Sequence, residues 1–217
     1  MPRTSWGWEI TRQELSQWTL YEDAQLLVLN KPAHVVCHPS KWGPGSSLAG
    51  ACREYLGLRK VHMPSRLDRE TSGVVVVAKS YPDASRLQRA VQRRQVRKVY
   101  HAILTGELRG PVRVDQPNGK APESAVSVRR AVVPGGAAAI TDFEPLACRL
   151  GLTLVRVIPH TGRNHQIRVH AQWLGHPVAG DKLYGPDETL FLEFLEFGWT
   201  ERHAALLPLD SQALHAS

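Results

Sequence analysis

The sequence predicts an α+β fold, built on a largely antiparallel mixed β-sheet with flanking helices and loops. Three observations lead to this prediction. Residues 74–78 are an unbroken run of valines ending in alanine, which is typical of a strand buried on both faces. Apolar and polar residues alternate along residues 97–106 and along two later runs, residues 141–148 and 152–159. Helical segments interleave with these strands without strict β-α-β alternation, which favours α+β over a parallel α/β sheet.

The first third of the chain predicts a β-hairpin, a loop and a helix. Residues 1–17 have no clear period and are expected to form an N-terminal tail or a short strand. Two apolar runs around an acidic turn predict a hairpin over residues 18–32. Glycine, proline and serine dominate residues 38–47 and predict a loop, after which Ser46 or Ser47 caps a helix. Gly57 ends this helix, whose inward face carries Leu48, Ala51, Cys52 and Tyr55.

Two further helices are expected, one on each side of the middle strands. Ser80 caps the first, with Pro82 in its first turn and an inward face of Ala84, Leu87 and Val91. The second helix follows His160 and stops at Gly175. Its cap and turn are expected to come from Thr161, Gly162 and Asn164. Its inward face is expected to carry Ile167, Ala171 and Leu174. Residues 125–133 predict a strand, and the aromatic segment F-L-E-F-L-E-F-G-W at residues 191–199 is expected to cover the core.

Composition restricts the classes of partner and compartment. The 217 residues are 42% hydrophobic and 22% charged, with a net charge of +7 and a pI near 9.6, which favours a polyanion such as RNA or DNA. Three cysteines, far apart and in no C-x-x-C pair, argue against a disulfide framework or a cysteine zinc site and fit a reducing cytoplasm. No apolar run approaches the length of a membrane span, so a cytoplasmic protein is expected.

An arginine-rich stretch follows the central strand. Between residues 86 and 98 no acidic residue interrupts the basic ones, so pairing along a helix cannot explain them. A solvated helix face is the plainer interpretation; phosphate binding is the one we favour. The residues expected to contact RNA here are Arg89, Arg93, Arg97 and Lys98.

Two charged segments are candidates for a site. Asp68 lies between Arg66 and Arg69 in a polar loop that leads into the buried strand, where catalytic groups are often placed, although local surface ion pairs would give the same pattern. Arg163 stands at the head of the helix after His160, where backbone N–H groups suit a phosphate. Four histidines lie near this helix with spacings of five, five and six, which do not place two ligands on one helical face, so no metal site is predicted.

Three blocks of sequence resemble the RluA-type family of RNA pseudouridine synthases. They are S-R-L-D-R-E-T-S-G-V-V-V-V-A-K, R-K-V-Y-H-A-I-L-T-G, and H-T-G-R-N-H-Q-I-R-V-H followed by G-H-P-V-A-G-D-K-L-Y-G. The stretch Y-E-D-A-Q-L-L-V-L-N-K-P gives weaker support, and together the blocks span roughly residues 20–186. The resemblance implies the pseudouridine synthase fold, with an active-site cleft across the sheet, and a cofactor-free isomerase acting on tRNA or ribosomal RNA.

The resemblance also assigns roles by position. It places the catalytic aspartate at Asp68, the active-site tyrosine at Tyr100 and the active-site basic residue at Arg168, while Arg66 matches the arginine that displaces the target nucleotide. A carboxylate can act as nucleophile or base, and an arginine can keep it ionised. Tyrosine offers a flat face for a base and a hydroxyl for the C5 proton. Base flipping with phosphate clamping explains the basic residues, among which we count Arg69, Arg163 and His165.

The chain departs from the family pattern at three places. Ser65 stands before Arg66, where the family usually has a histidine. Many relatives carry an N-terminal S4-type RNA-binding domain, but the seventeen residues before the first predicted strand leave no room for one. The sequence also ends early in a motif that relatives continue, so its C-terminus is expected to be either naturally short or truncated. We therefore expect one catalytic domain over residues 18–217, acting as a monomer by default.

Two other functions stay open at this point. The first is an RNA-binding homologue of the same fold that has lost turnover. The second is a retaining glycosidase in which Asp68 works with Glu70, although the basic surface suits RNA better than sugar.

Overall fold

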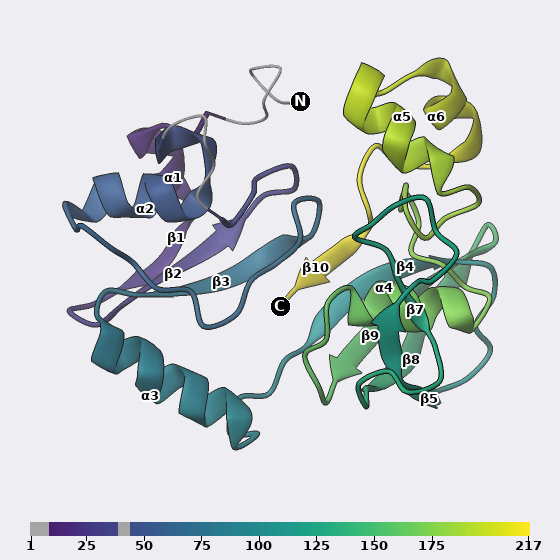
Figure 1. Ribbon diagram of the computed structural model, residues 1–217, viewed down its shortest axis with the longest axis horizontal. Coiled ribbons are helices and arrows are strands. Elements are labelled where there is room, and N and C mark those ends of the chain that lie inside the picture. Colours follow the sequence, from purple (N-terminus) through teal and green to yellow (C-terminus); the bar gives the residue numbers. More distant parts are fainter. Residues whose placement is uncertain (1–8, 39–43) are drawn as a thin grey trace. The chain divides into compact units, whose positions relative to one another are not determined.

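The computed structural model describes residues 9–38 and 44–217, and the contacts within the chain divide it into two compact units (Figure 1). The N-terminal unit comprises residues 1–97 with Ala216, and the C-terminal unit comprises residues 98–215 with Ser217. Each unit has an apolar core of its own. The predicted α+β class is confirmed, because antiparallel strands and flanking helices occur in both units.

In the N-terminal unit, strand β2 (Leu26–Lys31) pairs antiparallel with β1 (Thr19–Glu22) and with β3 (Ser72–Ala78). The first pair is the predicted hairpin. Its turn is held by the side chain of Asp23, which accepts hydrogen bonds from the amides of Gln25 and Leu26. The prediction for β3 is corrected in one respect: alternate residues are buried and half-buried, because the strand lies in an antiparallel sheet with only one fully covered face.

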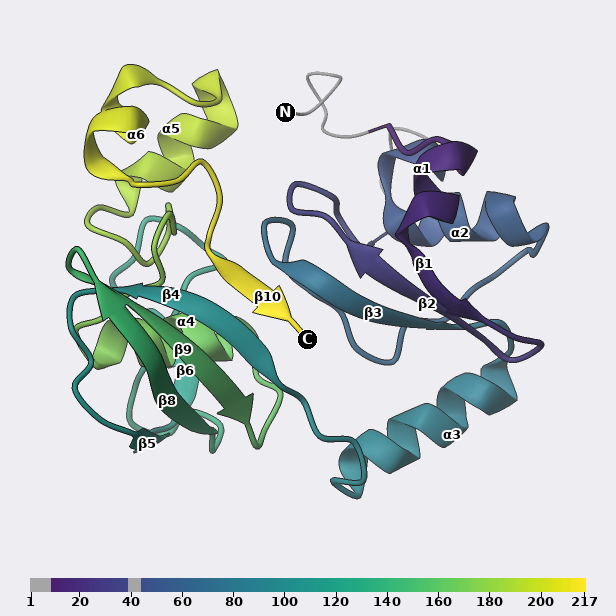
Figure 2. The ribbon, with the colours of Figure 1, turned by 180° about the vertical axis from the view of Figure 1, so that it is seen from behind.

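Helices α1 (Arg12–Trp18) and α2 (Leu48–Leu56) lie together on one side of these strands, as both views show (Figures 1 and 2). A single 3₁₀ turn, Pro44–Ser46, precedes α2. The predicted caps of α2 are confirmed: Ser47 accepts from the amide of Gly50, and Gly57 ends the helix in the left-handed region with φ of 64°. Helices α1 and α2 share an apolar core with strands β2 and β3, which contains Leu15, Leu27, Leu29, Leu48, Cys52, Val75 and Val77.

Helix α1 corrects the expectation of a tail or short strand at residues 1–17. Thr11 and Glu14 form a reciprocal capping box, and Leu15 is buried in the core. A helix of seven residues is too short to show a hydrophobic period, so the sequence pattern missed it. Residues 1–8 and part of the predicted loop at residues 38–47 lie outside the described residues.

Helix α3 (Tyr81–Gln92) lies on the other side of the strands and begins at the predicted cap, Ser80 (Figure 1). Ala84 is the buried member of its predicted inward face, while Leu87 and Val91 are half-buried. The helix therefore packs on the N-terminal unit through a narrow apolar face, and its basic residues lie on the exposed face.

The sheet of the C-terminal unit is antiparallel. Strand β9 (Leu152–Pro159) pairs with β4 (Tyr100–Thr105) and β8 (Ile140–Arg149), and β8 pairs in turn with β5 (Val112–Asp115). Strands β4, β8 and β9 match the three predicted alternating runs. Helix α4 (Gln166–Trp173) packs on this sheet, placing Ile167 and Ala171 in its core, with Leu174 against it, as predicted.

Two parts of the C-terminal unit differ from the predictions. The strand expected at residues 125–133 is reduced to β7 (Arg130–Val132), paired with β6 (Asn118–Lys120), because residues 122–129 form turns. Helices α5 (Thr189–Phe197) and α6 (Glu201–Leu206) follow, and α5 covers the core only in part: Leu190 is buried, whereas Phe197 is 68% exposed.

The chain ends in a short strand, β10 (Leu214–Ala216), whose Leu214 joins the core of the C-terminal unit. No helix in the described part of the chain is long and apolar enough to cross a membrane.

Candidate active site

Asp68 lies in the N-terminal unit, in the loop that leads into β3. The loop is closed by a hydrogen bond of 3.2 Å from the amide of Thr71 to the carbonyl of Asp68. At its start, His62 exchanges backbone hydrogen bonds with Ala78 at the far end of β3. The half-buried Asp68 is therefore presented by a turn that is fastened to a core strand at both ends.

Lys31 lies fully buried beneath this loop. Its Nζ donates to the carbonyls of Pro32 at 2.9 Å, Val35 at 2.9 Å and Arg69 at 3.1 Å. Burial lowers the pKa of Lys31 to about 8, a shift that negative charge at Cys37, Asp68 and Glu70 opposes. Because Arg69 follows Asp68 directly, Lys31 ties the Asp68 loop to the end of β2. In the sequence, Lys31 appeared only as part of the stretch N-K-P at the end of the predicted hairpin.

The two arginines of the Asp68 loop differ in exposure. Arg66 is exposed, and its Nη1 lies 2.6 Å from Nδ1 of His38. Burial and the charge of Arg66 lower the pKa of His38, which keeps the imidazole neutral beside the guanidinium. Arg69 is half-buried and contributes its carbonyl to Lys31.

The arginines of the basic stretch lie exposed on and after α3. Arg86, Arg89 and Arg93 follow the spacing of one helical face, and Arg97 is exposed beyond the helix end. Arg86 has an acidic neighbour, Asp83, at 3.8 Å. These side chains present positive charge to solvent, as expected of a phosphate-binding surface.

Tyr100 is the first residue of β4 in the C-terminal unit. It is half-buried and packs against the core cluster that contains Ala102 and Leu104, the next two residues on its side of the strand. The strand therefore holds the tyrosine ring at the border between core and surface.

The turn before α4 is organised by a buried glutamine. The side-chain oxygen of Gln166 accepts from the amide of Arg163 at 3.0 Å and from the hydroxyl of Thr161 at 2.7 Å, while its amide group donates to Ile140 and Thr141. The predicted cap is corrected, because the residue at the cap position is His165, with φ of 56° and no side-chain capping bond.

Arg163 and Lys98 lie at this turn. Arg163 is exposed and donates from Nε to the carbonyl of Ala138 at 3.0 Å. A Cβ on Gly162 would lie 3.7 Å from Nζ of Lys98, so the lysine ammonium reaches the turn beside Arg163. Burial lowers the pKa of Lys98. Two predicted RNA-binding residues are thus brought together at the head of α4.

Arg168 forms a buried ion pair with Asp181, a residue the sequence did not single out. The guanidinium donates from Nε to Oδ2 at 2.6 Å and from Nη2 to Oδ1 at 2.9 Å. Asp181 also accepts from the amides of Leu183 and Tyr184. Its complete burial acts to raise its pKa, but the charge and hydrogen bonds of Arg168, together with the two backbone hydrogen bonds, outweigh burial, so the pKa is lowered and the carboxylate is ionised.

Tyr184 links the two predicted site residues at the start of α4. Its ring lies under the guanidinium of Arg168, 4.7 Å from centroid to Cζ. Its hydroxyl lies 2.8 Å from Nδ1 of His165 and accepts from the amide of Arg130 at 2.9 Å. The G-D-K-L-Y-G segment contains both Asp181 and Tyr184, and that block was the only sequence signal for either.

The histidines around α4 have no common metal geometry. His170 is fully buried between the hydroxyl of Thr141 and the carbonyl of Gln116, and burial lowers its pKa. Within residues 9–38 and 44–217, no group of three or more histidine, cysteine or acidic side chains could hold a metal ion.

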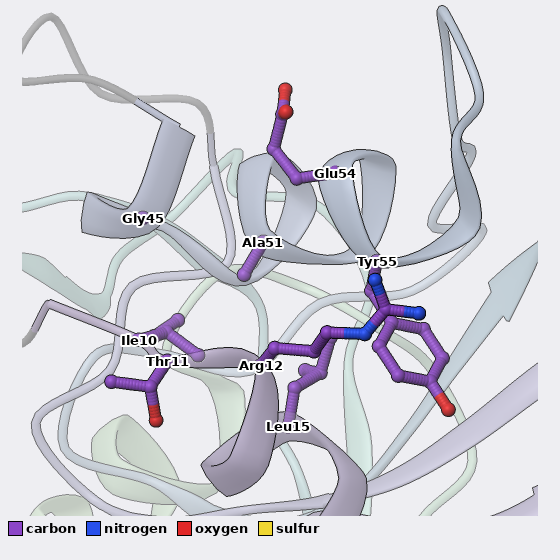
Figure 3. Close-up of a pocket in the computed structure, with 8 residues that line it drawn as sticks. All are labelled: Ile10, Thr11, Arg12, Leu15, Gly45, Ala51, Glu54 and Tyr55. Carbon is purple, nitrogen blue, oxygen red and sulfur yellow. The ribbon is translucent and has the colours of Figure 1, made fainter.

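A pocket of about 260 Å³ lies between α1 and α2 in the N-terminal unit (Figure 3). Arg12 of α1 lies over the ring of Tyr55 of α2, 5.3 Å from its centroid. The predicted site residues are not among those lining it, so the pocket is a product of helix packing and carries no part of the candidate site.

The predicted site residues thus occur in two groups. Asp68, Arg66, Arg69 and the exposed α3 arginines belong to the N-terminal unit. Tyr100, Lys98, Arg163, His165 and Arg168 belong to the C-terminal unit.

Comparison with known proteins gives consistent results. The chain is 36% identical over 214 residues to the ribosomal large subunit pseudouridine synthase D of Vibrio vulnificus, covering 96% of this chain and 63% of that protein. It is 40% identical over 173 residues to an uncharacterized RNA pseudouridine synthase of Bacillus subtilis, covering 76% of this chain and 60% of that protein. The chain therefore spans less than two thirds of the length of these relatives.

Two solved human structures are similar. RNA pseudouridylate synthase domain containing 1 matches with a TM-score of 0.71 at 26% identity, over 91% of this chain and 75% of that one. Human RNA pseudouridylate synthase domain containing 4 matches with a TM-score of 0.70 at 27% identity, over 94% of this chain and 84% of that one. The family model described as RNA pseudouridylate synthase matches residues 25–173. These matches confirm the resemblance predicted from the three sequence blocks, and the chain belongs to the RNA pseudouridylate synthase family.

Proposed function

We propose that this protein is an RNA pseudouridine synthase that isomerises specific uridines in structured RNA, with ribosomal RNA as the first substrate to test and tRNA as the second. The family match over residues 25–173 carries the proposal. A relative that shares 36% identity is named as a ribosomal large subunit pseudouridine synthase, which favours ribosomal RNA. We further propose one catalytic domain over residues 18–217, acting as a monomer without a cofactor.

The proposed reaction cleaves the bond between ribose C1′ and uracil N1, turns the base and joins C1′ to C5. The C5 proton is lost and N1 gains one, so the atoms of uridine are conserved. Asp68 acts as the nucleophile or base, which its place on a turn fastened to β3 supports. Tyr100 stacks on the base and relays the C5 proton, and Arg168 supplies positive charge during the reaction.

Binding would precede this chemistry. The target uridine has to leave its stack, and Arg66 is placed in an exposed position in the same loop as Asp68. Arg69, Arg89, Arg93 and Arg97 would add phosphate contacts from the N-terminal unit, and Lys98, Arg163 and His165 from the C-terminal unit. Neither a glycosidase nor an inactive homologue is favoured by the family match, because the relatives are named as synthases.

The test is pseudouridine mapping by carbodiimide-dependent reverse-transcription stops on unmodified RNA. Wild-type protein should produce stops at defined uridines, and Asp68→Ala should produce none while binding the same RNA with an unchanged salt dependence. Asp68→Asn is the matched variant, since it keeps the size of the side chain and removes only the charge. A chelator added to the wild type should leave the yield unchanged.

Two results would count against the proposal. Stops that persist with Asp68→Ala would exclude Asp68 as the catalytic residue. Salt-sensitive RNA binding by the wild type without any stops, on both ribosomal RNA and tRNA, would favour the inactive homologue.

A further inference from the structure

The segment after α4 contains a network that reaches back to two predicted site residues. Asp181 binds Arg168 through both of its carboxylate oxygens, and it is 0% exposed. A bidentate pair between arginine and carboxylate fixes the plane of the guanidinium as well as its position. Asp181 is itself fixed, because the amides of Leu183 and Tyr184 donate to it at 2.9 and 3.0 Å.

Tyr184 extends the network by a different interaction. Its ring packs against the guanidinium plane of Arg168, 4.7 Å from Cζ, on the same side chain that Asp181 holds. Its hydroxyl accepts a hydrogen bond from the backbone amide of Arg130 and lies 2.8 Å from Nδ1 of His165, so it can donate its own proton to that nitrogen. Donation in that direction would put the ring proton of a neutral His165 on Nε2.

His165 and Arg168 are three residues apart at the start of α4, so they are neighbours on its surface. His165 also has φ of 56°, a backbone conformation that is uncommon for a residue other than glycine. Such a conformation persists where its surroundings hold it, and the hydrogen bond to Tyr184 is one of the contacts that do so.

We infer that Asp181 and Tyr184 are positioning residues: Asp181 sets the orientation of the Arg168 guanidinium, and Tyr184 sets the tautomer and orientation of His165. The inference rests on the proposed function for its catalytic consequence, but not for its geometry. Burying a carboxylate costs free energy unless it is paired with a positive charge. The pair with Arg168, a predicted catalytic residue, therefore explains why Asp181 is buried at this position.

The geometry is tested by NMR of the full chain, independently of turnover. In the wild type, ¹⁵N spectra should show a slowly exchanging Nε–H of Arg168 and, for the neutral form of His165, a ring proton on Nε2, with assignments from Arg168→Gln and His165→Gln. Asp181→Asn should speed the exchange of the Arg168 Nε–H, and Tyr184→Phe should alter the His165 tautomer signals while leaving Arg168 protected. The inference is wrong if both signals are unchanged in these variants.

The catalytic consequence is tested by single-turnover kinetics on the RNA substrate that the mapping experiment identifies. Asp181→Asn should lower the rate by on the order of 10²-fold, with RNA affinity changed less than about twofold, because a misplaced group loses rate rather than binding. The double variant Asp181→Asn with Arg168→Gln should be no slower than Arg168→Gln alone. Additive losses would show that Asp181 acts independently of Arg168 and would overturn the inference.

A matched control comes from a second pair of arginine and aspartate in the same unit. Arg113 binds Asp142 through Nε at 2.6 Å and Nη2 at 2.9 Å, but that pair is exposed. Asp142→Asn should leave turnover unchanged. Should Asp181→Asn fail to fold, as circular dichroism would show, the Arg168 Nε–H of the wild type decides the Asp181 part, because fast exchange there would overturn it, and Tyr184→Phe decides the His165 part, because it keeps the packed ring and removes one hydroxyl. The absence of pseudouridine with wild type would contradict the proposed function and leave the NMR test of positioning intact.

Discussion

Lys31 is a buried lysine whose ammonium group is satisfied by three backbone carbonyls. The third carbonyl belongs to Arg69, next to the proposed catalytic Asp68. A lysine before a proline at the end of a strand gives no hint of burial in the sequence. Its enclosure depends on the loop that folds over it, so only the tertiary structure reveals it.

Lys31→Met is expected to lower the free energy of unfolding by about 2 kcal/mol, because three buried carbonyls lose their donor. The loss should grow with pH. The pKa of Lys31 is about 8 in the folded protein against 10.5 for the free group, so the unfolded state binds more protons between these values. The contribution of Lys31 to stability therefore rises through that window, by at most about 1.4 kcal/mol per pH unit.

Urea unfolding of wild type and Lys31→Met at pH 7.5 and 9.5 measures this effect. Lys79→Met is the control, because Lys79 forms a partly exposed pair with Glu22 at 2.7 Å. Stability curves of wild type and Lys31→Met that run parallel with pH would contradict the prediction.

Helix α3 shows what an element can be predicted to do from its sequence. Ser80 as the cap, Pro82 in the first turn and the apolar positions on one side were sufficient to predict the helix, because these are local signals. The charges on its other side follow from the same period. What the sequence could not decide is how little of the helix is buried, since Leu87 and Val91 are only half-covered.

Replacing Arg89 and Arg93 by glutamine should weaken RNA binding and reduce its dependence on salt. For each phosphate that is no longer neutralised, the slope of log affinity against log salt should fall by about 0.7 to 0.9. Filter binding between 50 and 200 mM salt measures the slope. The rate of the bound complex should be unchanged, because the arginines are proposed to bind the backbone and not to act on the base.

The control removes two positive charges elsewhere: Arg109→Gln with Arg149→Gln, both exposed in the C-terminal unit. If the two double variants weaken binding equally, the effect is one of net charge, and α3 is not a specific contact surface.

The whole molecule carries a net charge of +7 and ten histidines, and its response to acid depends on how these are enclosed. Burial lowers the pKa of His170, and the Arg113 side chain helps to lower the pKa of Asp142 to about 2. Both folded pKa values are below those of the unfolded chain. Each group therefore contributes stability above its unfolded pKa, and the contribution is lost as pH falls through the folded pKa.

Wild type is expected to lose stability between pH 7 and 5, and His170→Gln should lose less over the same range. Below pH 4 the two proteins should decline together, as carboxylates such as Asp142 become protonated. Thermal melts from pH 3 to 8 measure both phases, with His176→Gln as the control at a half-buried histidine. Equal losses in wild type and His170→Gln between pH 7 and 5 would show that the buried imidazole does not titrate there.

The sequence by itself determined the family and most of the regular elements. Local periodicity, turn residues and caps were sufficient to predict three parts of the fold. These are the hairpin of β1 and β2, helix α2 with Ser47 and Gly57 at its ends, and strands β8 and β9. The three sequence blocks identified the family, because long ordered motifs are specific even where single residues are ambiguous. They also named Asp68, Tyr100 and Arg168 as the residues to test.

Only the tertiary structure decided which side chains support them. Asp181 meets Arg168 across thirteen residues, Tyr184 meets His165 across nineteen, and Lys31 meets the carbonyl of Arg69 across thirty-eight. Such pairs depend on how strands and turns bring distant positions together, and no local pattern encodes that. The short helix α1 and the three-residue strands β6 and β7 depend on packing for the same reason, because segments of that length are not stable on their own.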